Sequence, residues 1–550
     1  APRVRGIRPD LGALGLAASG QRPIGLGVLS AAVTSPPGSN RRRTTILRHV
    51  AEAAVVLQDA PLARRALAAI TADPARGDSP LHPSAVERTR ALVAAEEGQL
   101  SEAVTLLAPS GDVRSRLLAR RLRAHSEQLQ ARELRDVLVH TPHSSPRPHS
   151  GSLTAVLHVV SNALPEQQAG YTIRTHGIVR AQRARGMDAH VVSRLGYPID
   201  VGVLAASTEI EVDGVPYHRL LPSRPLPVVG RRRTAMAAEE LSHVVRQCSP
   251  DLLHAHSKHD NAQASLIIGR QRGVPVIYEM RGFLEETWRT SGGSEHSDFY
   301  RWSRDSETLC MKNADGVVVL STAMAHDIIN RGVDPKRVTV VPNCVSKTFA
   351  RSLQPRSSVR AQLGIDAQAT VFGTVSTLND YEGLDTVIAA LQQADDDGMV
   401  LLIVGDGAAR ASLRRQAEPL GRRVVFTGRI PHAEVQNYLA AIDVFVVPRR
   451  PTPVTVLVPP IKPVEAMAAG KPVLASDLAP LVEIVRPGVF GAVVPAEDVL
   501  AWAEQMTALR YAPEHVRGMG ERAAAFVARE RTWAHAADRY AEIYATAVGR

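Results

Sequence analysis

The sequence predicts two successive α/β domains behind a helical N-terminal region. Short apolar runs of strand length alternate with helical segments from residue 154 to 343, and again from residue 369 to 494, which is the order in which parallel sheets are built. Before residue 140 the pattern is helical and rich in Ala, Leu and Arg. The polar, Pro-rich stretch TPHSSPRPHSG (141–151) lies between the two regions, so we expect a domain boundary there.

Length and composition agree with a multidomain globular protein. A chain of 550 residues, 45% of them hydrophobic, is long enough for about three domains. No apolar run approaches the roughly 20 residues that a membrane-spanning helix needs. The widely spaced Cys248, Cys310 and Cys344 give neither a disulfide framework nor a zinc pattern, so we expect a reducing cytoplasm.

The positive charge is concentrated in the N-terminal region. The whole chain carries +10, whereas residues 1–150 hold 21 arginines, no lysine and 13 acidic residues, a net +8. Such an excess favours a protein partner or peripheral contact with the inner membrane surface. Nucleic acid is not expected, because aromatic residues for base stacking are missing from this region.

Helices dominate the prediction for this region. Residues 88–109 indicate two helices joined at Gly98, and residues 114–139 one basic helix, read either as a solvated face of a packed bundle or as a partner or membrane surface. Residues 1–40, rich in Gly, Ala and Pro, receive no firm assignment.

The strands of the two α/β domains are predicted from apolar runs. Those of the first domain lie at 154–161, 188–195, 251–257, 274–279, 316–321 and 338–343. Those of the second lie at 369–376, 399–407, 423–429, 444–449, 472–476 and 491–494. A last helix at 532–548 is expected to pack back on the first α/β domain. No G-x-G-x-x-G follows the first strand, so a nicotinamide-dinucleotide fingerprint is absent.

A candidate anion site lies in the loop between Pro448 and Pro463. The loop carries Arg449, Arg450 and Lys462 and leads into a helix, and cations beside free backbone N–H groups suit a diphosphate. Glu465, in the first turn of that helix, is suited to accept hydrogen bonds from ribose hydroxyls. Ligands of parallel sheets bind where loops leave the carboxyl ends of the strands. We therefore predict a nucleotide-sugar site here.

An ordered set of motifs resembles one family of transferases. The motifs are GYTIRTHGI (170–178), LLHAHS (252–257), IYEMRGF (277–283), VVPNCV (340–345), YEGLD (381–385), LLIVGDG (401–407), VVFTGRIPHAEV (424–435) and KPVEAMAAGKPVLASD (462–477). From about residue 152 onward the chain is similar to GT-B glycosyltransferases of the retaining family 4 type. The resemblance implies an acceptor domain (151–350), a nucleotide-sugar donor domain (351–530) and a C-terminal helix (531–550). The helical region with its Pro-rich linker (1–150) lies outside the resemblance.

The chain departs from the family pattern at three positions. Where the family pairs an Arg with a Lys to hold the donor diphosphate, this sequence has Thr377 and Glu382. Of the family's two glutamates separated by seven residues, the second is Glu465 but the first position is Leu457. We hypothesise that Lys462 and one of Arg449 or Arg450 replace the missing cations, with Glu382 orienting one of them.

The resemblance also assigns further residues. It places Gly170, Gly428 and Arg429 at the donor alongside Arg449, Arg450, Lys462 and Glu465. It favours His254, His256, Arg281 and Glu382 as residues near the reaction centre. His254 and His256 share one face of a strand, but no further metal ligand is evident, so neither a metal site nor an essential divalent ion is predicted.

The implied activity is transfer of a sugar from a nucleotide diphosphate donor, expected to be UDP-linked, to an acceptor hydroxyl with retention of configuration, in the synthesis of a cell-surface polysaccharide or glycoconjugate. Two alternatives remain open. One is a UDP-sugar epimerase on the same fold. The other is a catalytically silent scaffold or sensor. Thr377, Glu382 and Leu457 favour this alternative because they depart from the family's donor-binding pattern.

Overall fold

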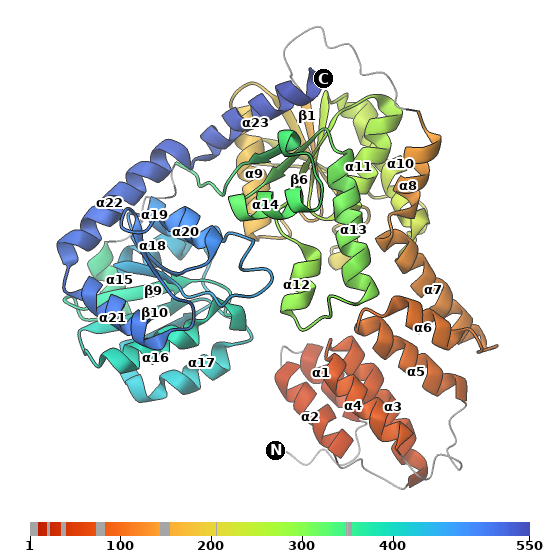
Figure 1. Cartoon of the computed structure of the whole chain (residues 1–550), viewed down its shortest axis with the longest axis horizontal. Coiled ribbons are helices and arrows are strands. Elements are labelled where there is room, and N and C mark those ends of the chain that lie inside the picture. The colour runs from red at the N-terminus through yellow and green to blue at the C-terminus, as the bar shows by residue number, and fades with distance from the viewer. Residues whose placement is uncertain are drawn as a thin grey trace. The chain divides into compact units, whose positions relative to one another are not determined.

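The computed structural model describes residues 9–18, 22–34, 40–72, 83–142, 155–204, 206–347, 349 and 355–549. The predicted linker (141–151) lies outside this description from residue 143 onward, and so do residues 350–354 at the predicted boundary between the α/β domains. The chain divides into two compact units, one helical and one containing two sheets (Figure 1).

The helical unit is built mainly from the N-terminal region. Its helices are α1 (Pro9–Ala18), α2 (Arg22–Thr34), α3 (Asn40–Val56), α4 (Ala60–Thr71), α5 (Pro83–Glu96), α6 (Leu100–Leu107), α7 (Val113–Leu129) and α8 (Arg132–His140), the last joining it only through its first residues. Alanine and leucine side chains from α1 to α5 fill one core, and those from α5 to α7 a second. The segment before residue 40, which the sequence left unassigned, thus contributes α1 and α2.

The helical unit also recruits two segments from later in the chain, residues 225–235 and 284–306. Gly98, between α5 and α6, accepts a hydrogen bond from the backbone N–H of Phe299 (3.0 Å). Asp298 accepts one from the N–H of Ser101 (2.7 Å). The unit therefore extends beyond residues 1–150, because parts of later helices complete its packing.

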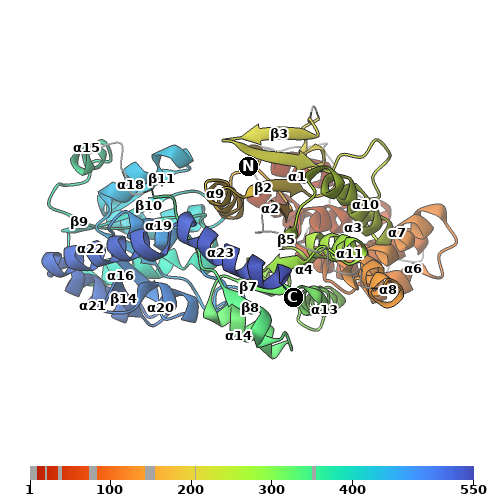
Figure 2. The same cartoon turned by 90° about the horizontal axis from the view of Figure 1, so that it is seen from above.

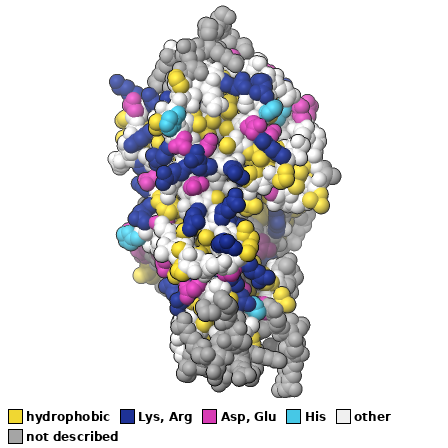
Figure 3. All heavy atoms as spheres, turned by 90° about the vertical axis from the view of Figure 1, so that its right-hand side faces the viewer, with side chains coloured by type: hydrophobic (Ala, Val, Ile, Leu, Met, Phe, Trp, Pro, Cys, Tyr) yellow, Lys and Arg dark blue, Asp and Glu magenta, His cyan; other side chains and the backbone are white. Residues whose placement is uncertain are grey.

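The predicted basic helix at 114–139 is two helices. Ala131 has a left-handed backbone (φ 51°), which ends α7 and starts α8. On α7 the basic side chains that face solvent are Arg114, Arg116, Arg120, Arg121 and Arg123. Figure 3 shows one face of the molecule on which basic side chains are interspersed with acidic ones. Among the described residues, every helix is too short or too polar to cross a bilayer.

The second unit contains an eight-stranded and a six-stranded sheet. The first has the order β3-β4-β2-β1-β5-β6-β7-β8 and is parallel except for the β3–β4 pair. Its strands are β1 (Ala155–Val160), β2 (Asp188–Ser193), β3 (Glu209–Val212), β4 (Val215–Arg219), β5 (Leu252–His256), β6 (Val276–Glu279), β7 (Gly316–Val319) and β8 (Val338–Val340). The six predicted strands are present, and the β3–β4 hairpin at the edge, visible in Figure 2, is an addition.

Helices cover this sheet as the βα alternation predicts. They are α9 (Gly170–Arg183), α10 (Arg231–Cys248), α11 (His259–Arg272), α13 (Asp298–Asn313) and α14 (Thr322–Asn330). The intervening α12 (Leu284–Thr290) and the first residues of α10 and α13 belong to the helical unit. The parallel strands read as continuous apolar runs because both faces are covered. His158, His254 and His256 interrupt those runs.

The second sheet is wholly parallel, with the order β11-β10-β9-β12-β13-β14. Its strands are β9 (Thr370–Val375), β10 (Met399–Val404), β11 (Val424–Gly428), β12 (Val444–Val447), β13 (Val473–Ser476) and β14 (Gly491–Val494). Its helices are α15 (Arg356–Gln362), α16 (Leu384–Ala394), α17 (Arg410–Ala417), α18 (Val435–Ala441), α19 (Lys462–Ala468), α20 (Ala479–Val485), α21 (Val499–Arg510) and α22 (Pro513–Glu530). Chain order reverses between β9 and β12, and such a switch point is where open α/β sheets bind ligands.

The last helix, α23 (Trp533–Val548), returns to the first sheet (Figure 1). Trp533, Tyr540 and Tyr544 lie in one apolar cluster with residues of β1, β5, β6 and β7. Their spacing puts them on one helical face. The hydroxyls of both tyrosines reach buried polar groups of the sheet, which makes this helix part of the candidate site.

Candidate functional site

Glu382 and Arg449 form the central ion pair at the carboxyl edge of the second sheet. Glu382 ends a short helical turn (380–382) after β9, and Arg449 follows β12 by two residues. The Arg449 Nε and Nη2 atoms donate to the two Glu382 oxygens at 3.1 and 2.8 Å, a bidentate pair. The expected pairing of Glu382 with one of the loop cations is therefore present.

Gly383 explains why the two loops approach so closely. A Cβ at this position would lie 2.0 Å from the carbonyl oxygen of Pro448, and its backbone is left-handed (φ 68°). Only glycine fits both conditions without displacement of the loop. The neighbouring Arg450 is held by Asp385 and by Glu497 (3.1 Å).

Lys462 and Glu465 form the second ion pair. The Lys462 Nζ donates to Glu465 Oε2 at 2.7 Å, across one turn at the start of α19. An ammonium has three donors, so two remain for a ligand, and Glu465 Oε1 remains as an acceptor. Because α19 has only seven residues, the ammonium of Lys462 rather than the helix dipole supplies most of the positive charge here.

The charges in these loops nearly cancel. The cations Arg449, Arg450 and Lys462 are each paired with carboxylates, which are Glu382, Asp385, Glu465 and Glu497. A bound diphosphate would therefore have to accept hydrogen bonds from those N–H groups of the cations that do not already bind a carboxylate. Arg449 offers Nη1, which donates a long hydrogen bond to the carbonyl oxygen of Val458 (3.5 Å).

Hydrogen bonds from side chains of the first sheet's domain to main-chain carbonyls hold the loop before α19. Ser321 donates to the carbonyl oxygen of Leu457 (3.0 Å), and Asn343 donates to that of Pro459 (3.2 Å). A Cβ at Gly170, the first residue of α9, would lie 3.7 Å from Ile461. The structure thus brings Gly170 next to the residue that precedes Lys462.

The other predicted donor residues lie on neighbouring loops. Gly428 ends β11 with a left-handed backbone (φ 76°), and its carbonyl oxygen accepts the N–H of Gly405 (3.0 Å). Arg429 and Thr377 are exposed. All three follow strands of the second sheet at the same edge as Glu382 and Arg449.

A buried polar cluster centres on Glu279, the last residue of β6. This fully buried carboxylate accepts hydrogen bonds from Arg174 Nε (2.9 Å), Arg281 Nε (2.6 Å) and the hydroxyl of Tyr540. Burial by itself would raise the pKa of Glu279. Arg281 and Arg174 outweigh that effect and hold the pKa of the carboxyl well below its usual range.

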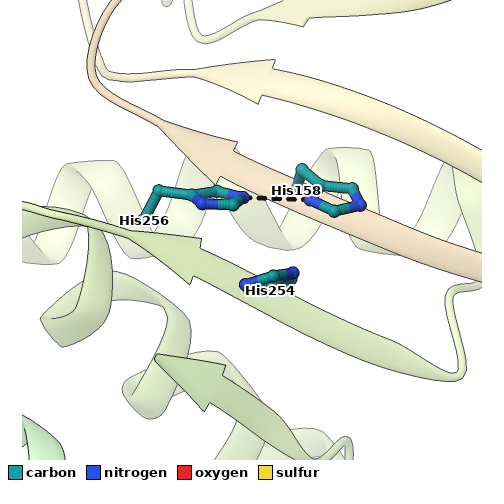
Figure 4. Close-up of side chains that lie close together, drawn as sticks. All are labelled: His158, His254 and His256. Carbon is teal, nitrogen blue, oxygen red and sulfur yellow. Dashed lines mark hydrogen bonds between the residues drawn. The ribbon is translucent and has the colours of Figure 1, made fainter. Parts of the chain in front are cut away.

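His158, His254 and His256 lie beside Glu279 and are all buried (Figure 4). His158 on β1 is paired in register with His254 on β5, and His256, two residues on, shares the same sheet face. The sequence predicts His254 and His256 near the reaction centre, and this stays a prediction. His254 Nδ1 lies 2.6 Å from the hydroxyl of Tyr544 on α23.

The hydrogen bonds assign the protons in this trio. Gln182 Oε1 can only accept, so His158 Nε2 donates to it (2.8 Å), and His158 Nδ1 then accepts from His256 Nε2 (2.9 Å). Burial lowers the pKa of His254, and it holds the pKa values of His158 and His256 well below the usual range. The trio is neutral at pH 7 and adds no charge to a phosphate site.

Arg281 retains one unused donor. Its Nη1 donates to the carbonyl oxygen of Tyr171 (2.8 Å) and to the Thr175 hydroxyl (2.7 Å), both on α9. Its buried Nη2 has no hydrogen-bond partner among the described residues. Glu279 orients this guanidinium, whereas Glu286, in the helical unit, accepts a hydrogen bond from the Tyr300 hydroxyl (2.8 Å).

Sequence reasoning missed several members of the Glu279 cluster. Arg174 and Tyr540 contact Glu279 directly, and His158 gives the two strand histidines a third neighbour. A lone histidine inside the apolar strand at 154–161 and the i, i+4 tyrosines of the last helix were the available signals. Neither reveals which groups meet, because the partners lie about 100 to 260 residues apart.

Comparisons with known proteins agree with this architecture. Residues 369–510 match the family described as "Glycosyl transferases group 1", and residues 169–344 match the "Glycosyl transferase 4-like domain". Together the two ranges cover more than half of the chain, one on each sheet. The protein is a glycosyltransferase of the group 1 type with a GT-B fold.

Three curated relatives are enzymes of this class. The chain is 26% identical over 355 residues (61% of this chain, 90% of the relative) to the alpha-maltose-1-phosphate synthase of Mycolicibacterium smegmatis. It is 32% identical over 216 residues (38% and 54%) to a GDP-mannose-dependent phosphatidylinositol monomannoside mannosyltransferase of Corynebacterium glutamicum. It is 29% identical over 255 residues (44% and 55%) to the D-inositol 3-phosphate glycosyltransferase of Nocardia farcinica, so the last two alignments span about half of each relative.

Solved structures show the same fold at low sequence identity. The sucrose-phosphate synthase of Thermosynechococcus elongatus superposes with a TM-score of 0.58 at 21% identity, covering 71% of this chain and 98% of that one. Anabaena HepE, solved in complex with UDP, gives 0.56 at 20% identity, covering 71% and 99%.

Proposed function

We propose that the protein transfers a sugar from a nucleoside diphosphate donor, UDP-linked, to an acceptor hydroxyl with retention of configuration. The observation that carries this proposal is the pair of ion pairs at the second sheet's carboxyl edge, Glu382–Arg449 and Lys462–Glu465. In each ion pair the carboxylate holds the cation in place, and some hydrogen-bonding groups of the pair stay free. Free cationic donors suit a diphosphate, and a free carboxylate oxygen suits ribose hydroxyls.

In this proposal Lys462 and the Nη1 of Arg449 bind the diphosphate and stabilise the charge that develops on it as the sugar leaves. Glu382 orients Arg449. It stands at the position where the family has a lysine, but its charge is negative. Glu465 accepts hydrogen bonds from the ribose hydroxyls. Gly428 and Arg429 border the base, and Gly170 lets α9 approach the phosphates.

Acceptor activation in the proposed mechanism needs no protein carboxylate beside the anomeric carbon. Leu457 stands where the family has its first glutamate, and its backbone carbonyl is engaged by Ser321. A phosphate oxygen of the donor would take the acceptor proton in a front-face reaction. We propose that donor binding needs no divalent cation, since Lys462 and Arg449 supply positive charge directly.

The biological setting proposed is synthesis of a cell-surface polysaccharide or glycoconjugate, with the protein in the cytoplasm or at the inner membrane surface. The exposed arginines of α7 would provide contact with anionic lipid or an acidic partner. The acceptor is a hydroxyl compound whose class is set by the first sheet's domain.

A catalytically silent nucleotide-sugar binder is the second candidate. The near cancellation of charge among Arg449, Arg450, Lys462 and their carboxylates favours it, because a neutral site stabilises a leaving diphosphate less. Mass-spectrometric screening of nucleotide sugars distinguishes the two, since a transferase consumes the donor when the acceptor is supplied and hydrolyses it slowly without one.

The decisive binding experiment is calorimetry with UDP and GDP on the wild type and on Lys462→Ala. Loss of a charged hydrogen bond costs about 1.5–3 kcal/mol, so the affinity should fall roughly 10- to 150-fold. Lys336→Ala removes the same charge from an exposed turn and should leave binding unchanged. Equal affinities of the wild type and Lys462→Ala would remove Lys462 from the donor site, and tighter binding of GDP would reassign the base.

A further inference from the structure

Three potential metal ligands converge at the edge of the first sheet, in residues that the proposed transfer does not use. His190 lies on β2, His218 on β4, and Cys248 is the last residue of α10. The Nδ1 of His190 lies 3.0 Å from the Nε2 of His218. The Sγ of Cys248 lies 3.4 Å from that Nε2 and 3.8 Å from the Nδ1.

The sheet register explains why the two histidines meet. Strands β2 and β4 are parallel neighbours, with His218 beside Val192. His190 precedes Val192 by two residues and therefore points to the same face. The two rings are stacked, with centroids 5.3 Å apart. The end of α10 then places Cys248 next to both.

Each histidine has a carboxylate behind it. Asp188 Oδ1 lies 2.9 Å from the Nε2 of His190, and Glu209 Oε1 lies 3.9 Å from the Nδ1 of His218. The contact with Asp188 keeps a proton on the outer nitrogen of His190 and directs the lone pair of its Nδ1 toward His218 and Cys248, as in carboxylate–histidine–zinc arrangements. Glu209 lies beyond hydrogen-bond distance of His218, but it adds negative charge on the outer side of that ring.

The three distances match a tetrahedral metal centre. With Zn–N near 2.0–2.1 Å and Zn–S near 2.3 Å, tetrahedral angles require about 3.3 Å between the nitrogens and about 3.6 Å between sulfur and each nitrogen. The observed separations of 3.0, 3.4 and 3.8 Å deviate by about 0.2–0.3 Å. The His158, His254 and His256 group is less suitable, because its nitrogens already bond to one another and to Gln182 and Tyr544.

We propose that His190, His218 and Cys248 bind one Zn²⁺ ion, with a solvent molecule at the fourth position. One thiolate and two imidazoles suit this borderline-soft ion better than Mg²⁺ or Ca²⁺, which prefer oxygen ligands. His190 and Cys248 are half-buried, so an ion can enter from solvent. The ion ties β2, β4 and the end of α10 together and thereby stabilises the sheet edge.

The first experiment measures metal binding by the full chain after dialysis against a chelator. We expect one equivalent of Zn²⁺ per chain, with an increase in the unfolding temperature. Co²⁺ in its place should give the intense visible bands of a tetrahedral site together with a thiolate-to-cobalt charge-transfer band. Lack of stoichiometric binding, or a Co²⁺ complex without the thiolate band, would overturn the proposal.

Matched variants locate the ion. Cys248→Ser should lower the Zn²⁺ affinity at least about 100-fold and abolish the thermal shift, because the thiolate is the strongest ligand. Asp188→Asn should lower the affinity about 10- to 100-fold while keeping one ion per chain. Cys310→Ala, at a cysteine buried elsewhere in the unit, should retain full affinity. Unchanged binding by a folded Cys248→Ser protein would place the ion elsewhere and contradict the assignment.

Discussion

The carboxyl edges of the two sheets each hold a carboxylate clamped by arginine, but the two clusters differ in their access to water. Glu279 is fully buried and is bound by two arginines and a tyrosine. Glu382 and Arg449 keep 13% and 14% of their side chains exposed and bind only each other closely. The fully buried network cannot exchange partners without leaving a buried charge unpaired, whereas water reaches the second pair and lowers that cost.

The two clusters also differ in the elements that they join and in the donors that they leave available. The Glu279 cluster joins α9, β6 and α23, elements drawn from three distant parts of the chain. Arg174 within it also holds the carbonyl oxygens of Val341 and Pro342, in the segment that leaves the first sheet. The Glu382 and Glu465 pairs instead hold cations whose other donors stay available to a ligand.

The largest expected effect is on stability. Glu279→Gln leaves Arg174 and Arg281 buried without a counter-charge and should lower the free energy of unfolding by about 3–5 kcal/mol. Glu382→Gln, at the pair that keeps some contact with water, should cost less, about 1–3 kcal/mol. Urea denaturation of both variants measures the contrast. Similar losses of unfolding free energy in the two variants would show that the two ion-pair clusters contribute equally to stability, which would contradict the contrast.

Acidification should also act on the buried cluster. The pKa values of His158 and His256 are depressed in the folded state, so between those values and about 6.5 the unfolded chain binds more protons and stability falls as the pH drops. Each histidine contributes up to about 1.4 kcal/mol per pH unit, which predicts a loss of about 2–3 kcal/mol from pH 6 to pH 5.

Unfolding curves at pH 7, 6 and 5 test this prediction. The depressed pKa of Glu279 works in the same direction only at still lower pH, as that carboxylate begins to be protonated. Stability that is flat between pH 6 and pH 5 would show that the histidines accept protons in the native state.

The next effect is on ligand affinity. Glu465→Gln removes the charge that positions Lys462 and weakens the acceptor offered to ribose, so the affinity for UDP should fall about 10-fold or more. The deoxyribose analogue of UDP provides the control. If Glu465 binds the ribose hydroxyls, the variant should discriminate less between the two nucleotides than the wild type does.

The smallest expected effect concerns Glu382. Glu382→Ala releases Arg449 from its bidentate partner and should weaken UDP binding by about 1 kcal/mol, or roughly fivefold, because the guanidinium is no longer held in place. Tighter binding by this variant would instead show that Glu382 competes with the diphosphate for Arg449. In that case Glu382 lowers the affinity of the site for the nucleotide.

Much of the fold could be predicted from local sequence. The strands at 369–376 and 399–407 are short apolar runs bounded by turn residues, and such runs determine their own structure wherever a sheet is covered on both faces. The β3–β4 hairpin was missed because Glu209–Val212 is a polar, half-exposed edge strand. The break at Ala131 was missed because alanine gives no signal for a left-handed backbone.

The candidate site was predictable only in part. Arg449, Lys462 and Glu465 are close in sequence and follow one strand, so their proximity could be inferred from one loop. The Glu279 cluster and the His190–His218–Cys248 group depend on side chains brought together by sheet order and by α23. Spacing along the chain does not encode such contacts, and Cys248 therefore looked isolated.

The most direct test of the central claim is a structure of the protein with UDP bound. The account predicts the diphosphate within hydrogen-bond distance of Lys462 Nζ and Arg449 Nη1, with a ribose hydroxyl on Glu465. A diphosphate held by other cations, with Lys462–Glu465 and Glu382–Arg449 unchanged and out of contact with the nucleotide, would contradict it.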